Sequence, residues 1–359
     1  MKVGKRQGTQ PGGRRILLGP YPPPYGGVAN YLAALVAALD EKKTPFELVI
    51  ASTVHRDGPH LRQDRRQVWG RFKGCGAADV CLDLSGFFLE YLLPLALIPW
   101  LVLKRWKGFR WVKVILDGTL EGRYRGFGPL HRFWFRLALS QVDEFVVASP
   151  QTRNWLVGAQ GVGVDVHVIP CLLPLSPEEV ARAKAFRPPA WFKGRKTWVC
   201  GIGVFTEPYG FDHVARAVEA IRRESGKDVG LLLLDGRFSR DEAYRTETLR
   251  NRGWIKVLEM VPRPEVLGYL RRSRVFVRSF SQDSYGISRV EALWCGVPVV
   301  ATRSGETRGM SLYDYGDVEG LTRTLRGALA GDGNAQVGPW ARRYEREARA
   351  NLRRILDLL

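Results

Sequence analysis

The feature that most constrains the fold is the alternation of short apolar segments with longer segments of helical periodicity. In the first half of the chain the predicted strands are 14–19, 46–52, 111–116, 144–149 and 164–170, and the predicted helices are 28–40 and 130–141. Strands that alternate with helices normally pair in parallel, with helices covering the faces of the sheet. The pattern therefore predicts an α/β fold with a doubly wound sheet.

The same alternation starts again after residues 171–196, a segment rich in proline and charge. Its predicted strands are 198–205, 230–236, 255–261, 275–280 and 297–302, and its predicted helices are 210–225, 245–253, 262–273 and 317–331. Two similar halves joined by one linker imply two Rossmann-like domains that face each other across a ligand cleft.

We accordingly divide the chain into five parts. They are a flexible basic tail (1–14), an N-terminal Rossmann-like domain (15–172), a linker (173–196), a C-terminal Rossmann-like domain (197–338) and a helix that packs back on the N-terminal domain (339–359). The tail is not followed by an apolar segment with a cleavage site, so it does not read as a signal peptide.

The net charge of +19 is the extreme feature of the composition, and it concentrates at residues 55–73 and 104–113. Such surfaces attract nucleic acid, anionic lipid or phosphorylated substrates. The alternative is a solvated basic face without a specific partner. The five cysteines are scattered without a C-x-x-C pair, which indicates neither a zinc site nor a disulfide framework and fits the cytosol.

Residues 84–111 form a mostly apolar run that is about as long as a membrane span. Glu90, Pro94 and Pro99 interrupt the run and argue against a spanning helix. Two interpretations stay open. The run is either a helix pair buried in the core, or a helix in the membrane interface with Trp100, Trp106 and the basic flank at headgroup level.

The segment 283–302, DSYGISRVEALWCGVPVVAT, places a loop between the end of a predicted strand and the start of a helix. Open α/β sheets bind ligands at this edge, and the amides at a helix N-terminus favour anions. Gly286 lets a ligand approach the backbone closely. A phosphate on these amides, with Asp283 and Glu291 accepting hydrogen bonds from sugar hydroxyls, would account for two carboxylates around one loop.

The alternative interpretation of this segment is a well-capped helix without a ligand. Ser288 and Glu291 have the spacing of a capping box, and Gly296 and Pro298 have the spacing of a C-terminal stop. On this interpretation Glu291 only caps its helix.

The motif Asp283-x7-Glu291 followed by ALWCGVPVVAT resembles the E-x7-E and A-x3-G-x-P-V-V-A-T motifs of family 4 glycosyltransferases, which have the GT-B fold. Three further segments are similar to that family in the expected order: GPYPPPYGGVANYLAAL, VHVIPCLLP and GETRGMSLYDYGDVEGLTRTL. The resemblance implies a retaining glycosyltransferase that needs no metal or cofactor. Its N-terminal domain would bind the acceptor and its C-terminal domain a nucleotide-diphosphate sugar.

The resemblance also implies roles for individual residues. Glu291 would bind the nucleotide ribose, and Asp283 would contact the transferred sugar. The backbone at Tyr285, Gly286 and Ile287 would hold sugar and phosphate. Gly26 and Gly27 would lie near the donor diphosphate.

The sequence departs from the family pattern at three places. Asp117 stands where a histidine is usual. A carboxylate there would accept a hydrogen bond from a sugar hydroxyl, but it could not act as a cation toward phosphate. The alternative interpretation is that Asp117 is an ordinary turn residue. Val204 and Tyr209 stand where arginine and lysine are usual, which leaves Arg278, Arg289 and Arg308 as the nearby cations for a leaving diphosphate. Asp283 is one methylene shorter than the usual glutamate.

These observations predict an enzyme with a glycan or lipid-linked acceptor, located in the cytoplasm at the inner face of the membrane, where the basic N-terminal half meets anionic lipid. One alternative is a GT-B protein that binds a sugar or a partner but no longer catalyses. The other alternative is a nucleic-acid-binding protein. The basic residues form no recognised binding module, which argues against it, so no specific nucleic acid is expected as a partner.

Overall fold

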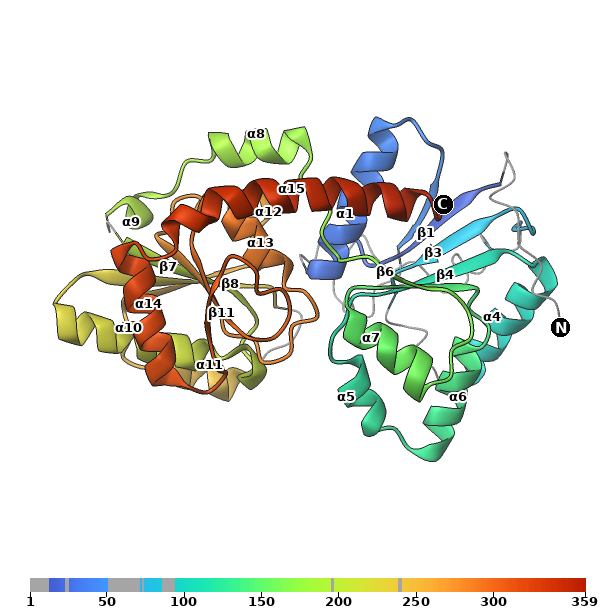
Figure 1. The fold of residues 1–359 in the computed structure, drawn as a ribbon, viewed down its shortest axis with the longest axis horizontal. Helices are drawn as coiled ribbons and strands as arrows, with labels where there is room; N and C mark the ends of the chain where they lie inside the picture. The colour runs from blue at the N-terminus through green and yellow to red at the C-terminus, as the bar shows by residue number, and fades with distance from the viewer. Residues whose placement is uncertain are drawn as a thin grey trace. The chain divides into compact units, whose positions relative to one another are not determined.

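The computed structural model describes residues 13–22, 26–50, 72, 74–85, 94–194, 197–237 and 241–359, with the backbone alone at 94–97 and 99. The chain forms two compact units. Unit 1 comprises residues 1–21, 31–170 and 351–359, and unit 2 comprises residues 22–30 and 171–350. Each unit contains one parallel sheet with helices around it (Figure 1), which confirms the predicted pair of doubly wound α/β domains.

The sheet of unit 1 has six parallel strands in the order β2-β1-β3-β4-β5-β6. The strands are β1 (Arg15–Gly19), β2 (Glu47–Ile50), β3 (Val80–Asp83), β4 (Arg110–Ile115), β5 (Glu144–Val147) and β6 (Val166–Val168). The chain moves from β1 to one side and then to β3 on the other side. The order therefore reverses between β1 and β3, the place where such sheets bind ligands.

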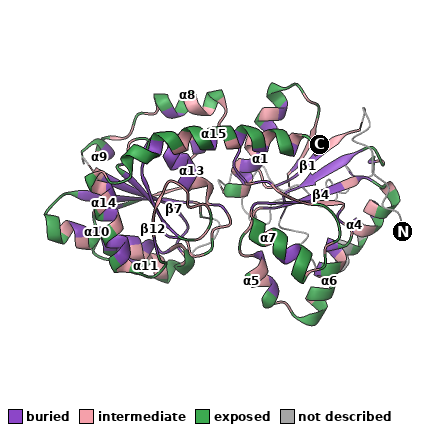
Figure 2. Ribbon diagram, viewed as in Figure 1, coloured by how far each residue is buried: buried purple, intermediate pink, exposed green. Residues whose placement is uncertain are grey.

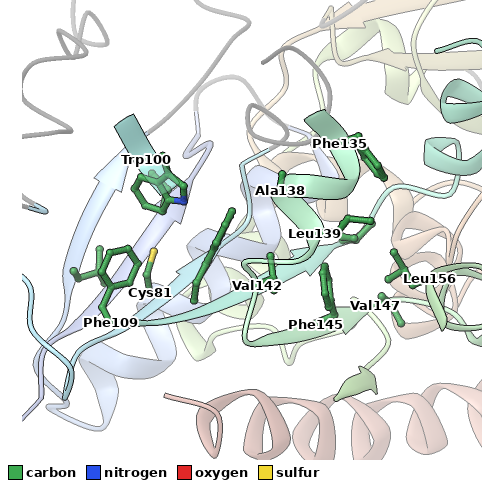
Figure 3. Close-up of a cluster of buried hydrophobic side chains, with 14 of the residues drawn as sticks. Cys81, Trp100, Phe109, Phe135, Ala138, Leu139, Val142, Phe145, Val147 and Leu156 are labelled. Carbon is green, nitrogen blue, oxygen red and sulfur yellow. The ribbon is translucent and has the colours of Figure 1, made fainter. Parts of the chain in front are cut away.

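The helices that follow these strands are α1 (Gly27–Glu41), α4 (Pro94–Lys107), α5 (Leu120–Arg125), α6 (Pro129–Leu139), α7 (Pro150–Asn154) and a π-helical turn (Trp155–Ala159). Side chains of α4, α6 and the π-helical turn enter one hydrophobic core with β1, β3, β4 and β5, as Figure 3 shows for Trp100 and Phe135. Trp100 is buried at the centre of this core, in edge contact with Phe72, Phe109 and Trp111. Of the two interpretations of the run 84–111, the one that places Trp100 at a membrane headgroup is therefore wrong, and the burial of Trp100 agrees with the other.

The sheet of unit 2 also has six parallel strands, in the order β12-β11-β10-β7-β8-β9. The strands are β7 (Thr197–Gly203), β8 (Val229–Asp235), β9 (Ile255–Glu259), β10 (Val275–Arg278), β11 (Val299–Thr302) and β12 (Ser311–Tyr313). The order reverses between β7 and β10, so the ends of these two strands mark the expected ligand position of this sheet.

The main helices of unit 2 are α8 (Pro177–Ala185), α9 (Ala190–Lys193), α10 (Phe211–Ser225), α11 (Glu242–Leu249), α12 (Arg263–Leu270), α13 (Ile287–Trp294), α14 (Val318–Ala330) and α15 (Asn334–Leu356). The proline-rich segment 171–196 thus contains two helices, and α8 packs against α12. The last helix starts at Asn334 and contains Pro339; the last nine residues of the chain, 351–359, belong to unit 1.

In the described part of the chain, no helix has the length and hydropathy needed to cross a membrane. Helix α4, within the apolar run 84–111, has 14 residues and ends in Lys104, Arg105 and Lys107.

Candidate active site

The motif segment lies at the switch point of the unit 2 sheet. Strand β10 ends at Arg278, the loop 279–286 follows, and α13 begins at Ile287. Gly286 is the N-cap of α13 with φ +80°, a backbone conformation that favours glycine. The first-turn amides of a helix have no partner within the helix, so this end of α13 presents N–H donors toward the loop.

The side chain of Asp283 is only 6% exposed and is held by two arginines. Its Oδ1 accepts from Arg278 Nη2 at 2.7 Å, and its Oδ2 accepts from Arg278 Nε at 2.8 Å. Arg289 Nη2 lies 3.0 Å from the same Oδ2. Burial by itself would raise the pKa of Asp283, but Arg278 and then Arg289 outweigh it and hold that pKa below its usual value. Asp283 is therefore ionised in the folded protein at neutral pH.

Arg289 is fully buried and organises the loop after β11. Its Nη1 donates to the carbonyls of Thr302 and Glu306 at 3.1 and 3.0 Å and to that of Ser304. Burial lowers the pKa of Arg289 by more than Asp283 restores. The side chain is directed into the protein, so in this structure it reaches a ligand only through its charge.

Arg278 is the more versatile of the two arginines. It donates to the carbonyl of Ile202 at 2.7 Å and lies over the rings of Tyr209 and Phe280 at 5.0 and 5.1 Å. The two rings stack with centroids 4.2 Å apart. Tyr209, at a position where the family pattern has lysine, thus forms a flat support for a cation at the end of β7.

Glu291 does not cap its helix, and the alternative capped-helix interpretation of this residue is wrong. The helix begins at Ile287, so Ser288 lies inside it rather than at its N-cap. Glu291 Oε1 instead accepts from Arg263 Nε at 2.8 Å, and Arg263 Nη2 lies 2.7 Å from the same oxygen. Gly296 follows the helix with φ +83°, as expected for a C-terminal stop.

Arg263 also joins Glu291 to the segment between the two sheets. Its Nη1 lies 3.1 Å from Glu179 Oε1, and Glu179 forms a capping box with Ser176 at the start of α8. Burial would lower the pKa of Arg263, but Glu291 and Glu179 outweigh it, so that pKa is raised. The sequence analysis missed both Arg263 and Glu179. Only the S-P-E-E capping signature at 176–179 could have drawn attention to Glu179.

Two glycines keep the loop compact around Asp283. A β-carbon on Gly286 would lie 2.9 Å from Asp283 Oδ2 and from Arg289 Nε. A β-carbon on Gly305 would lie 2.9 Å from the β-carbon of Asp283 and from the carbonyl oxygen of Tyr285. Tyr285 is buried, and its carbonyl accepts from the amide of Glu306 at 2.9 Å. The loop is therefore closely packed around Asp283 and fixed by backbone hydrogen bonding.

The other predicted residues lie on other elements, but Gly27 is near the motif loop. Residues 22–30 belong to unit 2, and a β-carbon on Gly27 would lie 4.0 Å from Ile287 Cδ1, at the start of α13. Gly26 and Gly27 are at the start of α1, and the carbonyl of Gly26 accepts from the amide of Asn30. Asp117 follows β4, and its Oδ1 accepts from the amide and the hydroxyl of Thr119, both at 2.8 Å. It also pairs with Arg123. These contacts are those of the turn interpretation of Asp117.

Arg308, the third predicted arginine, pairs with two carboxylates. Arg308 pairs with Glu306 at 2.6 Å and with Glu347 at 3.0 Å, so its charge is already balanced. Among the residues described, no group of three His, Cys, Asp or Glu side chains is placed to hold a metal ion. Metal independence stays a prediction.

Unit 1 has a second buried polar cluster at its own switch point, which the sequence analysis also missed. Asp83, the last residue of β3, pairs with Lys113 at 3.1 Å and accepts from Trp111 Nε1 at 3.1 Å and from the amide of Ser85 at 2.8 Å. Lys113 also donates to the carbonyl of Ser85. The cluster fixes the backbone at the carboxyl end of β3.

Comparison with known proteins connects this geometry to a family. Residues 196–330 match the model of the family described as glycosyl transferases group 1. The matched range includes Arg263, Arg278, Asp283, Arg289 and Glu291. A search of curated proteins found no match to this sequence.

Solved structures resemble the whole chain. An α,α-trehalose-phosphate synthase (UDP-forming) from Burkholderia xenovorans, in complex with glucose-6-phosphate, has a TM-score of 0.69 at 15% identity, with 97% of this chain and 100% of that chain covered. HepE from Anabaena, in complex with UDP-glucose, has a TM-score of 0.65 at 14% identity, with 96% and 100% covered. A sucrose-phosphate synthase from Thermosynechococcus elongatus has a TM-score of 0.62 at 16% identity, with 95% and 94% covered. The chain has the GT-B fold of these enzymes, and its residues 196–330 form a glycosyltransferase domain.

Proposed function

We propose that the protein is a retaining, metal-independent glycosyltransferase that moves a sugar from a nucleotide-diphosphate sugar to a lipid-linked or polysaccharide acceptor at the cytoplasmic face of a membrane. Uridine is the base to test first, because the solved structures that resemble the chain include one with UDP-glucose and one described as UDP-forming. The observation that supports the proposal best is the pair of oppositely charged clusters at the end of β10 and along α13.

The first cluster suits a phosphate. Arg278 and Arg289 together carry a formal charge of +2 and Asp283 carries −1, so +1 remains beside the N-terminus of α13. A helix N-terminus adds a partial positive charge. Negative charge that develops on a leaving diphosphate would be stabilised there without a metal.

The second cluster suits hydroxyl groups. Glu291 and Glu179 carry −2 and Arg263 carries +1, so −1 remains. Arg263 occupies Glu291 Oε1, whereas no described residue is shown donating to Glu291 Oε2. A carboxylate oxygen accepts about two hydrogen bonds. Oε2 is therefore available to a ribose with its two neighbouring hydroxyls, the role that the resemblance assigns to Glu291.

Asp283 has fewer free hydrogen-bond acceptor positions than its expected contact with a sugar would need. Three of its roughly four acceptor positions are occupied by Arg278 and Arg289. A sugar hydroxyl would have to use the remaining position on Oδ1 or displace an arginine. This observation favours a second candidate function, in which the protein binds a nucleotide sugar without transferring it.

The test separates binding from transfer. Thermal shifts with UDP, GDP, ADP and their glucose conjugates are measured on the wild type, Glu291→Gln and Glu179→Gln. Both variants weaken the ion pairs of Arg263, and glutamine at position 179 keeps an oxygen that accepts from the amide of Ser176. Only Glu291→Gln is expected to abolish the nucleotide shift, since a ligand stabilises the folded state in proportion to its affinity. An equal loss in both variants would mean that Glu291 is structural.

Transfer is then followed with the donor that binds, by release of the nucleoside diphosphate in the presence of membrane extracts or isolated glycans, with and without EDTA. NMR of the product identifies the anomer. Binding without turnover over a broad acceptor panel would favour the noncatalytic alternative. No shift with any nucleotide would contradict both.

A further inference from the structure

Helix α4 has an apolar side that the core does not use. Trp100 and Leu103 face the core of unit 1. Ile98, Val102 and Trp106, spaced four residues apart, lie on the other side with 45, 61 and 74% of their surface exposed. Residues four apart share one side of a helix. A folded protein gains nothing by exposing such a row to water, so the row indicates a surface that binds something.

Helix α6, which contacts α4, also has an apolar side that the core does not use. It packs beside α4, and both helices enter the same core through their inner sides. Its own inner side supplies Phe135 and Leu139 (Figure 3), whereas Leu130 and Phe133 are 67 and 58% exposed. Figure 2 shows exposed residues along both helices. We call the five outer side chains the apolar patch: Ile98, Val102, Trp106, Leu130 and Phe133.

The two helices that carry the patch are basic. Neither α4 nor α6 contains an acidic residue, and together they contain five basic ones: Lys104, Arg105, Lys107, Arg132 and Arg136. Lys104 pairs with Asp143 at 2.7 Å, and the Lys107 ammonium lies 4.0 Å from the centre of the Trp106 ring. For the remaining three, no ion pair with a carboxylate is seen among the described residues.

We propose that the apolar patch docks unit 1 onto an anionic lipid surface. Apolar side chains with a tryptophan and a basic rim match the boundary between headgroups and acyl chains. Each arginine or lysine near an anionic bilayer adds attraction that decreases within a Debye length. A second copy of the chain fits less well, because two patches in contact would bring together eight positive charges that no described carboxylate balances.

This inference builds on the proposed function at one point, the membrane-bound acceptor. A protein held by α4 and α6 would work at the membrane surface, where a lipid-linked acceptor resides. Docking itself needs neither donor nor acceptor, so it is testable even if the proposed transfer is wrong.

The experiment measures flotation of the full-length protein with phosphatidylcholine vesicles, with and without 30% phosphatidylglycerol, in about 150 mM salt, where the Debye length is about 8 Å. The apolar variant is V102S/W106S/F133S, and the basic variant is R105Q/R132Q/R136Q. Each has a control. Val157→Ser changes an exposed apolar residue of unit 1 outside the patch, and R216Q/R326Q/R349Q removes the same charge from exposed helices of unit 2.

The wild type is expected to bind the anionic vesicles, and both patch variants to lose about tenfold or more in partition coefficient, which corresponds to about 1.4 kcal/mol. Both controls should stay within about twofold of the wild type. Equal binding by all five proteins, or no binding by the wild type, would overturn the proposal. So would a wild-type dimer in sedimentation velocity that V102S/W106S/F133S converts to a monomer. Nucleotide thermal shifts measured on the same variants should be unchanged, which separates failure of docking from failure of donor binding.

Discussion

The cluster around Asp283 gives the sharpest stability prediction. The substitution Asp283→Asn keeps the shape and one acceptor oxygen but removes the charge that balances two guanidinium groups, that of Arg289, which is fully buried, and that of Arg278, whose side chain is 11% exposed. Breaking a buried ion pair by removing one partner costs about 3–5 kcal/mol, and the remaining amide oxygen favours the lower end, about 3 kcal/mol. For a unit of this size each kcal/mol lowers Tm by about 2–4 °C, so we expect a loss of about 6–12 °C.

The pH dependence of this loss has a definite sign. The folded-state pKa of Asp283 lies below its unfolded value, so the ion pairs add stability that is complete above the unfolded pKa of about 4. That stability is lost as the pH falls through the folded-state pKa. The difference between the wild type and Asp283→Asn should therefore be constant from about pH 8 to 5 and shrink below about pH 4.

The assay is urea unfolding, followed by tryptophan fluorescence at several pH values. The control is Asp314→Asn, which removes the carboxylate of the exposed pair with Arg303. Exposed pairs contribute about 0–1 kcal/mol, so this variant should resemble the wild type at every pH. If Asp283→Asn were as stable as Asp314→Asn at pH 7, or if its deficit persisted unchanged at pH 3, the reasoning from buried charge would be refuted.

Three further predictions concern other parts of the structure and are measured by the same unfolding assay. Gly286→Ala should lower the free energy of unfolding by more than Gly296→Ala. Both positions have positive φ, which costs about 1–2 kcal/mol for alanine, but only at Gly286 would the β-carbon meet other atoms within 4 Å. Equal losses would contradict the close packing around Asp283. Trp100→Ala should lower the free energy of unfolding by about 3–5 kcal/mol, because Trp100 is buried. Trp106→Ala should lower it by less than about 0.5 kcal/mol, because Trp106 is exposed. The reverse order would contradict the placement of Trp100 in the core. Ser176→Ala should cost about 1 kcal/mol through loss of the capping box, and a neutral effect would mean that the box does not stabilise α8.

The sequence predicted the architecture because both sheets consist of mostly apolar strands separated by helices. It missed β3 and β12, which have four and three residues. Strands of the same length that were predicted, such as β5, β6 and β10, contain two β-branched residues each, whereas β3 contains one and β12 none. It left the run 84–111 open between a buried helix pair and a helix in the membrane interface, whereas in the described part Trp100 faces the core and Trp106 faces solvent. Apolar composition alone does not distinguish the two sides of a helix when both sides are apolar.

The candidate site was predictable where its residues are neighbours in sequence. Asp283, Arg278 and Arg289 lie within twelve residues, and the loop geometry brings them together. The partners of Glu291 were not predictable, because Arg263 is 28 residues away and Glu179 is 84 residues from Arg263. The capping motif shows the same limit. Ser176 and Ser288 both begin an S-x-x-E pattern, and only the position of the helix start decides that the one at Ser176 is a capping box and the one at Ser288 is not.

The aspartate at position 283, where the family pattern has glutamate, fits the packing around it. The β-carbon positions of Gly286 and Gly305 both lie 2.9 Å from atoms of Asp283, so the backbone closes tightly around a short side chain. Its two oxygens meet Arg278 at 2.7 and 2.8 Å. A glutamate would carry its carboxylate one methylene further, past Arg278, and would add volume to a closed site. The short acid and the two arginines are therefore best understood as one unit, in which Asp283 holds positive charge at the start of α13 and the excess charge of +1 is what a diphosphate would meet.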